Sequence, residues 1–282
     1  MVVFETLTKI TCSLPDVSDA LALSDAAGWN QTADDWRLFV RHGRTIGYRD
    51  SRSALVATAA ALPYDGGKGW ISMVLVAAPW RHQGVATQLL GECVKYLQQL
   101  SAIPLLDATP AGVSAYRNAG FEAGFELARW EGEVTPSQAS LPDTLRGASG
   151  ADLQQLVVLD TVVNGVGRRF LLEDFLSRDL SRAWIARDGS GFVITRQGRR
   201  ATQIGPLVAA DETSALSLLN AALGSTRGRV FLDLPDHWTL LAKLLEQRGF
   251  ARQRPFARMA LGPVSVACPN KRLFLLAGPE FG

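Results

Sequence analysis

The sequence predicts an α/β protein built from two similar halves, and three observations support this fold class. The chain has 282 residues, which is enough for two domains of ordinary size. Hydrophobic residues make up 47% of the chain and charged residues 20%, a composition typical of proteins with apolar cores. A short apolar sequence, Leu-Val-Ala-Ala, occurs at residues 75–78 and again at residues 207–210. This recurrence indicates an internal repeat.

The similarity between the halves continues after this first match. In each half a helical stretch with a Leu-Leu pair follows, then a short apolar strand ending in Leu-Asp, and then a second helical segment ending in Gly-Phe. These further matches are Leu89-Leu90 with Leu218-Leu219, Leu106-Asp107 with Leu232-Asp233, and Gly120-Phe121 with Gly249-Phe250. Matches in the same order favour a duplicated strand–helix–strand–helix unit over two unrelated units that share this order.

The local patterns of the first half agree with this order of elements. Residues 70–76 are apolar and rich in residues that favour strands, so they predict a buried strand. Apolar residues recur at helical spacing between positions 86 and 100, which predicts a helix with one face on a sheet. Residues 103–106 predict the next strand, and residues 113–119 predict a short helix that ends at Gly120.

A polar segment separates the two halves. Residues 134–142 are mostly small or polar and contain Pro136 and Pro142, a composition typical of a linker. We therefore expect a first domain at residues 1–135, a linker at residues 136–144 and a second domain at residues 145–282.

Charge and composition argue against several kinds of partner. The formal net charge is only +2, with 11 Lys and Arg against 14 Asp and Glu in residues 1–140 and 18 against 13 in the rest, so we expect no nucleic acid partner. No apolar run has the length of a membrane span, and the first residues do not resemble a secretory signal. The three cysteines are far apart, which fits a reducing cytoplasm, and the three histidines are too scattered for a metal site.

A glycine-containing turn lies between the predicted buried strand and the amphipathic helix. Its sequence is Trp-Arg-His-Gln-Gly-Val-Ala-Thr, at residues 80–87. Free main-chain N–H groups at such a turn and the positive end of the helix dipole together form an anion site. A side chain at Gly84 would hold a phosphate away from these amides. Arg81 either adds a positive charge beside the anion or pairs with a local carboxylate.

This turn resembles motif A of the GNAT superfamily of N-acetyltransferases, which has Arg/Gln-x-x-Gly-x-Gly/Ala at this place. Residues 105–121 are similar to motif B of the same superfamily, in which a tyrosine precedes Gly-Phe by four residues, as Tyr116 does here. The resemblance covers about residues 1–135. The segments at 28–31, 107–112 and 277–280 are further similar to a bacterial group of GNAT proteins with a second, degenerate GNAT-like half. The resemblance implies two such domains, each with a central mixed β-sheet flanked by helices.

The resemblance also implies acetyl-coenzyme A as the co-substrate, and it gives roles to particular residues. Tyr116 would protonate the leaving thiolate, since a phenol with a pKa of about 10 can donate to a thiolate whose acid has a pKa of about 8.5. The main chain of one segment would pair with the pantetheine arm: Val74, Leu75 and Val76. The amides of another would hold the pyrophosphate: His82, Gln83, Gly84, Val85, Ala86 and Thr87.

The acceptor is expected to be a primary amine of a small molecule that attacks the thioester directly. Residues 69–78 contain no Asp or Glu that would serve as the base on the central strand, which departs from the family pattern. Asp107, Asp34, Asp35 and a chain of water molecules remain candidates, and none is assigned.

Two segments are candidates for binding the acceptor. Trp29 and Asn30, with Gln31, follow an early helical stretch where GNAT proteins shape the acceptor pocket, although Trp29 fits equally well as the residue that closes that helix. Asp160 and Arg168 form part of a polar, glycine-rich patch in which an arginine could bind a carboxylate. A solvated loop is the alternative interpretation of this patch.

The second half lacks the features that would bind the cofactor. Leu207 and Leu218 are 11 positions apart, whereas Leu75 and Leu89 are 14 apart, and the missing residues are those of the turn. Asp211 and Glu212 stand there instead and would repel a pyrophosphate. Leu245 replaces the tyrosine. This half is therefore expected to be a scaffold, a wall of the acceptor pocket or the surface of a homodimer.

Two other functions were compared with acetyl transfer. A protein that senses acyl-coenzyme A without transferring the acyl group is the alternative, and the missing strand carboxylate favours it. A nucleotide-binding phosphate loop is excluded because no Gly-Lys-Ser/Thr follows the turn.

Overall fold

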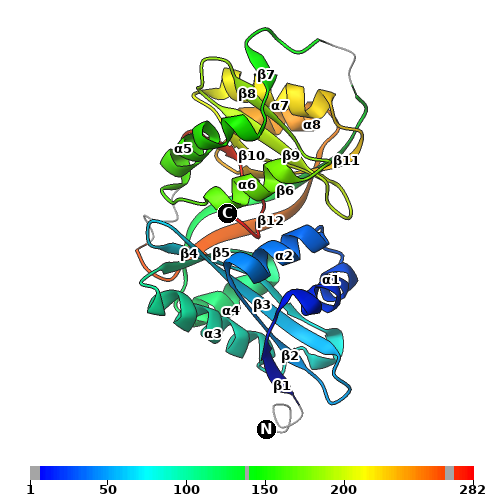
Figure 1. Ribbon diagram of the computed structural model, residues 1–282, viewed down its shortest axis with the longest axis vertical. Helices are drawn as coiled ribbons and strands as arrows, with labels where there is room; N and C mark the ends of the chain where they lie inside the picture. Colours follow the sequence, from blue (N-terminus) through cyan, green and yellow to red (C-terminus); the bar gives the residue numbers. More distant parts are fainter. Residues whose placement is uncertain (1–6, 137–139, 264–269) are drawn as a thin grey trace. The chain divides into compact units, whose positions relative to one another are not determined.

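The computed structural model describes residues 7–136, 140–263 and 270–282. The chain forms two compact units, Met1–Leu106 and Asp107–Gly282 (Figure 1). Both contain a β-sheet with helices packed on it, so the predicted α/β class is confirmed.

The sheet of the first unit is mixed. Its strands lie in the order β1-β2-β3-β4-β5, and every neighbouring pair is antiparallel except β4 and β5, which are parallel. Their bounds are β1 Thr8–Thr11, β2 Arg44–Arg49, β3 Leu55–Tyr64, β4 Lys68–Val76 and β5 Ile103–Ala108, of which the last two residues belong to the second unit.

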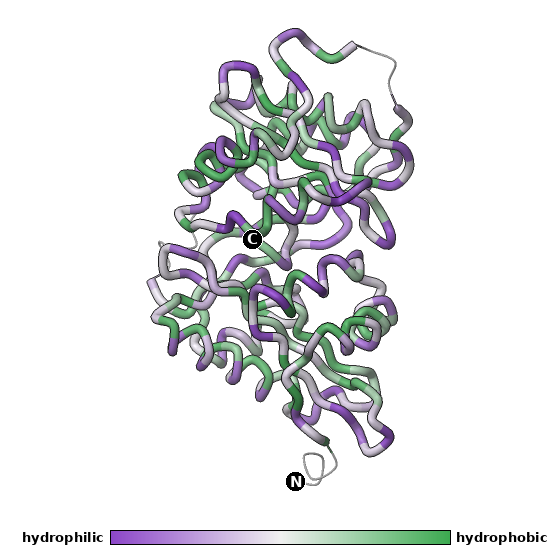
Figure 2. Tube along the Cα trace, in the orientation of Figure 1, coloured by the Kyte–Doolittle hydropathy of each residue, from purple (hydrophilic) through white to green (hydrophobic). Residues whose placement is uncertain are grey.

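Helices cover the sheet of the first unit: α1 Val17–Ala26, α2 Ala33–His42 and α3 Val85–Gln99, with short 3-10 helices η2 Leu14–Asp16 and η3 Ala78–Trp80. The apolar stripe of α3 is buried, as the spacing predicts, and includes Leu89, Cys93 and Leu97. A Cβ atom on Gly69 of β4 would lie only 2.3 Å from the Leu97 side chain. The glycine therefore lets α3 lie directly on β4. Figure 2 shows the hydrophobic residues along these strands and helices.

The second unit also has a mixed sheet, with the strand order β12-β6-β11-β10-β9-β8-β7 and with β13 paired to β10. Among the described strand pairs of this unit, only β10 and β11 are parallel. The strands are β6 Glu122–Val134, β7 Leu145–Gly147, β8 Arg182–Ala186, β9 Phe192–Arg196, β10 Thr202–Val208, β11 Gly228–Pro235, β12 Ala251–Ala260 and β13 Leu273–Leu275. The helices are α4 Pro110–Asn118, α5 Leu153–Asn164, α6 Arg169–Ser177, α7 Glu212–Gly224 and α8 Thr239–Gln247, with the 3-10 helix η4 Gly150–Asp152.

The repeat seen in the sequence recurs in the order of elements. In the first half β4, α3, β5, α4 and β6 follow one another, and in the second half β10, α7, β11, α8 and β12 do the same. The last strand of the first half, β6, pairs with strands of the second half. It pairs with β11 on one side and β12 on the other.

Two buried ion pairs hold these strands together. Arg129 of β6 donates two hydrogen bonds to Asp233 of β11, at 3.0 and 2.9 Å. Arg258 of β12 donates two to Asp107 of β5, both at 2.9 Å. In the repeat, Asp107 corresponds to Asp233 and Arg129 to Arg258. The carboxylate of each half therefore takes the arginine of the other half.

The compact units divide after Leu106, whereas the sequence places the domain boundary at residues 136–144. The difference arises because the partners of β6 come from residues more than ninety positions later in the chain. The domain bounds at 1–135 and 145–282 stay a prediction, and residues 137–139 of the expected linker lie outside the described residues.

Candidate active site

Strand β4 contains an extra residue near its middle. Leu75 lies opposite Thr58 of β3 and Ser72 lies opposite Ala60, so three steps along β4 face two along β3. Met73 has a φ of 55°, a left-handed value that is rare for a residue with a side chain. The hydroxyl group of Thr58 donates a hydrogen bond of 3.0 Å to the Met73 carbonyl. This extra residue is a β-bulge, at which a strand bends locally, and β4 stays paired with β3 as far as Val76.

Strands β4 and β5 pair only over their first residues. The parallel register runs from Lys68 opposite Ile103 to Trp70 opposite Leu105. Strand β4 continues to Val76, and among the described residues no β5 partner faces this later part. The unpaired edge includes Val74, Leu75 and Val76, the residues predicted to pair with pantetheine. Main-chain N–H and C=O groups on such an edge can bind an extended ligand as an added strand.

The turn after β4 is fixed by its own side chains. The Arg81 Nε atom donates to the Val76 carbonyl at 2.9 Å, and the Gln83 amide donates to the Pro79 carbonyl at 2.8 Å. His82 and Gly84 both have left-handed backbones, with φ of 59° and 82°. The side chain of Arg81 thus bonds a main-chain oxygen, and among the described residues it forms no ion pair with a carboxylate.

The main-chain N–H groups of residues 82–87 have no acceptor within the described part of the chain. The first helical hydrogen bond of α3 runs from the Gln88 amide to the Gly84 carbonyl, at 3.1 Å. Gly84 is the N-cap residue and has no side chain that would cap the helix, and the first turn of α3 contains no acidic residue. Free donors and the helix dipole are the features from which the sequence predicts an anion site here, and binding of an anion stays a prediction.

The matching turn in the second unit is closed by a carboxylate. Asp211 is the N-cap residue of α7, and its Oδ1 atom accepts a hydrogen bond from the Ser214 amide at 2.8 Å. This main-chain hydrogen bond is the largest of the effects that lower the pKa of Asp211. Glu212 adds a second acid to the first turn. A negative charge therefore already occupies the place that an anion would take.

Tyr116 lies on α4, which belongs to the second unit. Its ring is half-buried and packs edge-on against Phe121, with 6.1 Å between ring centroids. A Cβ atom on Gly112, one helical turn earlier, would lie 2.8 Å from the Tyr116 ring. Gly112 thus makes room for this ring orientation. The role of Tyr116 beside the cofactor sulfur stays a prediction.

The loop between α1 and α2 carries the residues predicted to bind the acceptor. Trp29 is half-buried, and its amide donates to the Ser24 carbonyl at 3.0 Å, so its main chain closes α1. Asn30 and Gln31 are buried. The Gln31 Oε1 atom has no hydrogen-bond partner among the described residues, which leaves a buried acceptor for an N–H donor. The two interpretations of Trp29 remain compatible with this geometry.

The acidic residues considered as a base all have structural partners. Both oxygens of Asp107 bond to Arg258, and the carboxyl group is fully buried; burial raises its pKa, against the lowering effect of Arg258. Asp34 pairs with Arg37, and Asp35 accepts a hydrogen bond from the Thr32 amide at 2.7 Å in the capping box of α2. No base is assigned.

Asp160 and Arg168 form a buried ion pair, with bonds of 2.7 and 2.9 Å. Arg168 is only 2% exposed, so the interpretation of this patch as a solvated loop is wrong for these two residues. The Nη1 atom of the Arg168 guanidinium group donates to the main-chain oxygens of Phe281 and Gly282. These partners come from the end of the sequence, and local spacing gives no sign of them. Binding of the acceptor by this pair stays a prediction.

The described cysteines do not offer a nucleophile. Cys12 and Cys93 are buried, and burial raises the pKa of each thiol to about 12. Cys268 lies outside the described residues. In the described ranges the structure groups no set of three metal-binding side chains and contains no helix able to span a membrane.

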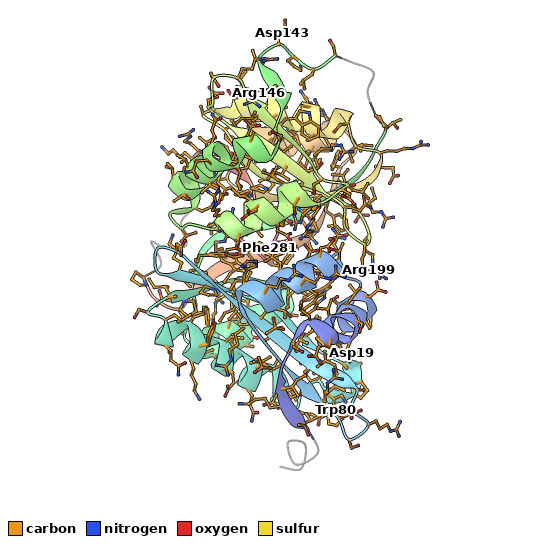
Figure 3. The ribbon with its side chains drawn as sticks, in the orientation of Figure 1. Asp19, Trp80, Asp143, Arg146, Arg199 and Phe281 are labelled. Atoms are coloured by element: carbon orange, nitrogen blue, oxygen red, sulfur yellow. The ribbon has the colours of Figure 1, made fainter. Side chains whose placement is uncertain are left out.

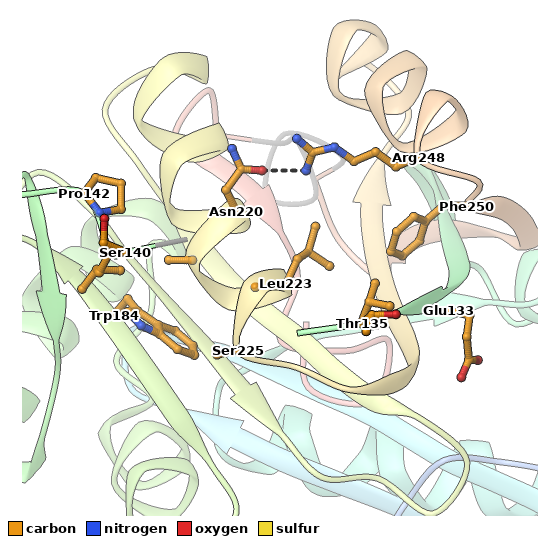
Figure 4. Close-up of a pocket in the computed structure, with 14 residues that line it drawn as sticks. Glu133, Thr135, Ser140, Pro142, Trp184, Asn220, Leu223, Ser225, Arg248 and Phe250 are labelled. Atoms are coloured by element: carbon orange, nitrogen blue, oxygen red, sulfur yellow. Dashed lines mark hydrogen bonds between the residues drawn. The ribbon is translucent and has the colours of Figure 1, made fainter. Parts of the chain in front are cut away.

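A separate pocket of about 770 Å³ opens on the second unit (Figure 4). Trp184, Leu223 and Phe250 line it, and Arg248 bonds to Asn220 at its rim, at 2.6 Å. None of the residues predicted from the motifs contributes to it.

Comparison with known proteins extends this picture. The protein-family model described as "Acetyltransferase (GNAT) family" matches residues 16–121 of the sequence. A second family model, described as "Acetyltransferase (GNAT) domain", matches residues 156–275. An uncharacterized N-acetyltransferase of Bacillus subtilis strain 168, YitH, is 25% identical over 240 residues, which are 83% of this chain and 84% of the relative.

Solved structures share the fold. A putative acetyltransferase from Pyrococcus horikoshii has a TM-score of 0.83 at 18% identity, with 100% of this chain and 98% of that chain covered. A tandem GNAT protein from the clavulanic acid biosynthesis pathway has a TM-score of 0.61 at 12% identity, with 91% and 99% covered. Both similarities concern the fold.

Proposed function

Because the chain is a GNAT acetyltransferase with two such domains in tandem, we propose that its first domain transfers the acetyl group of acetyl-coenzyme A to a primary amine of a small molecule. The family assignment makes the chain a transferase enzyme that uses an acyl-coenzyme A. The observation that carries the proposal is the turn after β4, where the consecutive main-chain N–H groups of residues 82–87 lack acceptors within the described chain.

The proposed site divides the coenzyme between the turn and the strand before it. The pyrophosphate accepts hydrogen bonds from the amides of residues 82–87 and lies at the positive end of α3. The exposed guanidinium of Arg81 adds a permanent positive charge beside it. The pantetheine arm lies along residues 74–76, where β4 has separated from β5. The free edge supports this, because no described residue of β5 pairs with residues 74–76.

In the proposed reaction the amine attacks the thioester directly. The nitrogen lone pair forms the new bond to the carbonyl carbon, the carbon–sulfur bond breaks, and the sulfur leaves as a thiolate. Tyr116 gives its phenolic proton to this thiolate, and the amine loses a proton to water or to a base that is not assigned. A covalent enzyme intermediate is not required, and the high pKa of the buried Cys12 and Cys93 thiols argues against one.

The second domain binds no coenzyme A in this proposal. Asp211 and Glu212 occupy its turn, and Leu245 stands where the first domain has Tyr116. It acts as a scaffold, as a wall of the acceptor pocket or as the surface of a homodimer. A cytoplasmic location without nucleic acid, membrane or metal partners remains part of the proposal.

The test is calorimetry of the full chain with acetyl-coenzyme A, followed by detection of released thiol with a panel of small amines. We expect binding, and thiol release with at least one amine. Binding without release for every amine would contradict acetyl transfer and would indicate a sensor of acyl-coenzyme A.

The variant Gly84→Glu tests the turn itself. A carboxylate at this N-cap position should abolish binding of coenzyme A, because it places a negative charge among the amides. Gly249→Glu is the matched control: Gly249 is exposed in the second unit and has a φ of 80°, so it imposes similar backbone strain. Equal affinities for Gly84→Glu and Gly249→Glu would remove the turn from the site.

A further inference from the structure

Strand β10 of the second unit repeats the irregularity of β4. Ile204 lies opposite Thr195 of β9 and Leu207 lies opposite Val193, so β10 also has one extra residue at this place. Strands β10 and β11 pair in parallel only from Thr202 to Ile204. The two strands then separate, as β4 and β5 do after Trp70. The second domain therefore keeps the strand geometry that forms a cofactor slot in the first domain.

In the second domain this slot is filled by the chain itself. Strand β13 pairs with β10 in antiparallel fashion, with Leu275 opposite Leu207 and Leu273 opposite Val208. On the other side, the Leu276 amide donates to the Asp233 carbonyl of β11 at 3.0 Å. The segment thus bonds to both separated strands. In the repeat, Leu207 and Val208 correspond to Leu75 and Val76, the proposed partners of pantetheine.

The side chains of this segment are fully packed. Leu273, Phe274, Leu275 and Leu276 are at most 3% exposed. The Trp238 ring of the α8 N-terminus stacks on Phe274, with 4.1 Å between centroids, and its indole N–H donates to the Leu273 carbonyl at 2.7 Å. Trp238, the N-cap residue of α8, therefore covers Phe274 and bonds to the main chain of the segment.

Beyond β13 the chain is held by two buried arginines. Arg196 of β9 donates to the Ala277 carbonyl at 2.5 Å and pairs with Glu280 at 2.8 Å. Arg168, which precedes α6, donates to the carbonyls of Phe281 and Gly282. The Phe281 ring, labelled in Figure 3, packs against Phe175 of α6 at 5.5 Å.

The place where the chain ends has a counterpart in the first domain. In each half two helices follow the first strand: α1 and α2 follow β1, and α5 and α6 follow β7. Ser13 and Ser149 precede these helical pairs, and the main-chain amide of each donates to the aspartate three residues later. Arg168 stands directly before α6, as Thr32 stands before α2. The loop before Thr32 contains Trp29, Asn30 and Gln31, the predicted acceptor residues.

We propose that residues 272–282 are a built-in occupant of the second domain and fill both its cofactor slot and its acceptor site with an extended peptide of the same chain. The comparison of this slot with a pantetheine site rests on the proposed function of the first domain. The finding that residues 272–282 fill the slot does not depend on that function. A covalently linked segment has a high effective concentration at its site, so a free ligand must compete with it at a disadvantage. The second domain is thus complete without coenzyme A.

The test uses the full chain, folded with the segment in place. A protease site is inserted after Gly262, in an exposed bend that follows β12, and the purified protein is then cut. We expect the fragment that begins after the cut to stay bound during gel filtration in native buffer, without loss. We also expect the Leu276 amide to exchange its hydrogen as slowly as the amides of β10 and β11. Release of the fragment while the remaining chain keeps its Tm would overturn the proposal.

Two substitutions in the cut protein make the test specific. Leu275→Asp places a charge in the closed slot and should cause the fragment to dissociate, whereas Lys271→Asp changes an exposed residue of the same fragment and should not. Equal retention of both fragments would contradict an occupied slot. Neither readout uses coenzyme A. A wild-type chain that fails to bind coenzyme A would therefore refute the proposed function and leave this inference standing.

Discussion

Gly84 combines two requirements in one residue. Its φ of 82° is a backbone conformation that glycine adopts without strain, and its missing side chain leaves the neighbouring amides open. The repeat provides a comparison, because Asp211 at the start of α7 uses its carboxylate to cap the helix. The same helical end is thus open in one half and satisfied in the other. The chemistry differs because of the residue at the N-cap.

Tyr116→Phe tests the proposed acid. Loss of the phenolic proton should lower kcat by about 100-fold, the lower end of the range for general acid catalysis, and should leave the KM for acetyl-coenzyme A nearly unchanged. Tyr96→Phe on α3 is the control, since Tyr96 contacts Arg44 through its ring. Steady-state kinetics with the best amine measures both. A kcat equal to that of the wild type would exclude Tyr116 as the acid.

The ion pair of Asp152 with Arg146 predicts how the stability of the protein depends on pH. Two hydrogen bonds from Arg146, followed by one from the Ser149 amide, lower the pKa of Asp152 to about 2. A carboxyl group with a lowered folded-state pKa stabilises the protein above its unfolded-state pKa of about 3.9 and loses this effect as the pH falls through the folded value. Asp152→Asn should therefore lower Tm at pH 7, and the difference should shrink from about pH 4 toward pH 2.

Thermal unfolding at several pH values measures this difference. Asp179→Asn, at an exposed residue, removes the same charge and serves as the control. A difference in Tm between Asp152→Asn and the wild type that stays constant over this range would contradict the assignment of the effect to the ionised carboxylate.

Individual residues of the turn could be predicted, but their conformations could not. Residues 81–87 lie between a strand and a helix as the motif indicates. The left-handed backbone conformations of Met73 and His82 cannot be predicted from the sequence, because side-chain identity says little about φ for residues other than glycine. For the same reason the sequence offered a carboxylate or an anion as the partner of Arg81, and the Val76 carbonyl was not foreseen.

At the scale of elements, strand β4 and helix α3 together define the site. The strand supplies an unpaired edge after Trp70, and the helix supplies unpaired amides at its start. The turn between them is short, so both features stay at the same end of β4. A ligand with an extended arm and an anionic group matches this arrangement.

An acid in the first turn of α3 should have opposite effects on stability and on affinity. Thr87→Glu should raise the free energy of unfolding by about 0.3–1 kcal/mol through the helix dipole, while it weakens coenzyme A binding by repulsion. Gln98→Glu in the last turn is the control and should slightly destabilise the helix with no change in affinity. Urea unfolding and calorimetry test both. Thr87→Glu with unchanged affinity would argue against an anion at this helix end.

The elements with strong patterns were predicted, and the others were not. The strand at 70–76 and the helix between 86 and 100 appear as β4 and α3, because their apolar spacing reflects burial on one face. The bulge in β4 depends on its register with β3, and β13 depends on the slot between β10 and β11. The bulge and the position of β13 each depend on how two strands pair. The sequence of one segment alone does not predict this pairing.

For the whole molecule, the exchange of ion pairs links the two halves of the sequence. Strand β6 has partners on both sides that come from the second half, and Asp107 takes its arginine from β12. The sequence shows two similar halves. In the structure, strand β6 of the first half pairs with strands of the second half.

Residues 1–135 alone should therefore fail to form a stable domain. Without the second half, β6 loses β11 and β12, and removing one partner of a buried ion pair costs about 3–5 kcal/mol. We expect this fragment to aggregate or to unfold without cooperativity, and co-expression with residues 136–282 to restore a folded complex. Circular dichroism and gel filtration test this. A soluble fragment with cooperative unfolding and affinity for coenzyme A would contradict it.

The sequence by itself determined the α/β class, the repeat and the family, and it predicts the anion-binding turn, because these depend on local spacing and on residue types that chemistry constrains. The tertiary structure alone decided which strands pair, where Asp107, Asp160 and Arg168 find their partners, and what fills the second slot. Those contacts join residues up to 151 positions apart. Their geometry depends on the folded chain, since an extended strand carries no local mark of its neighbour.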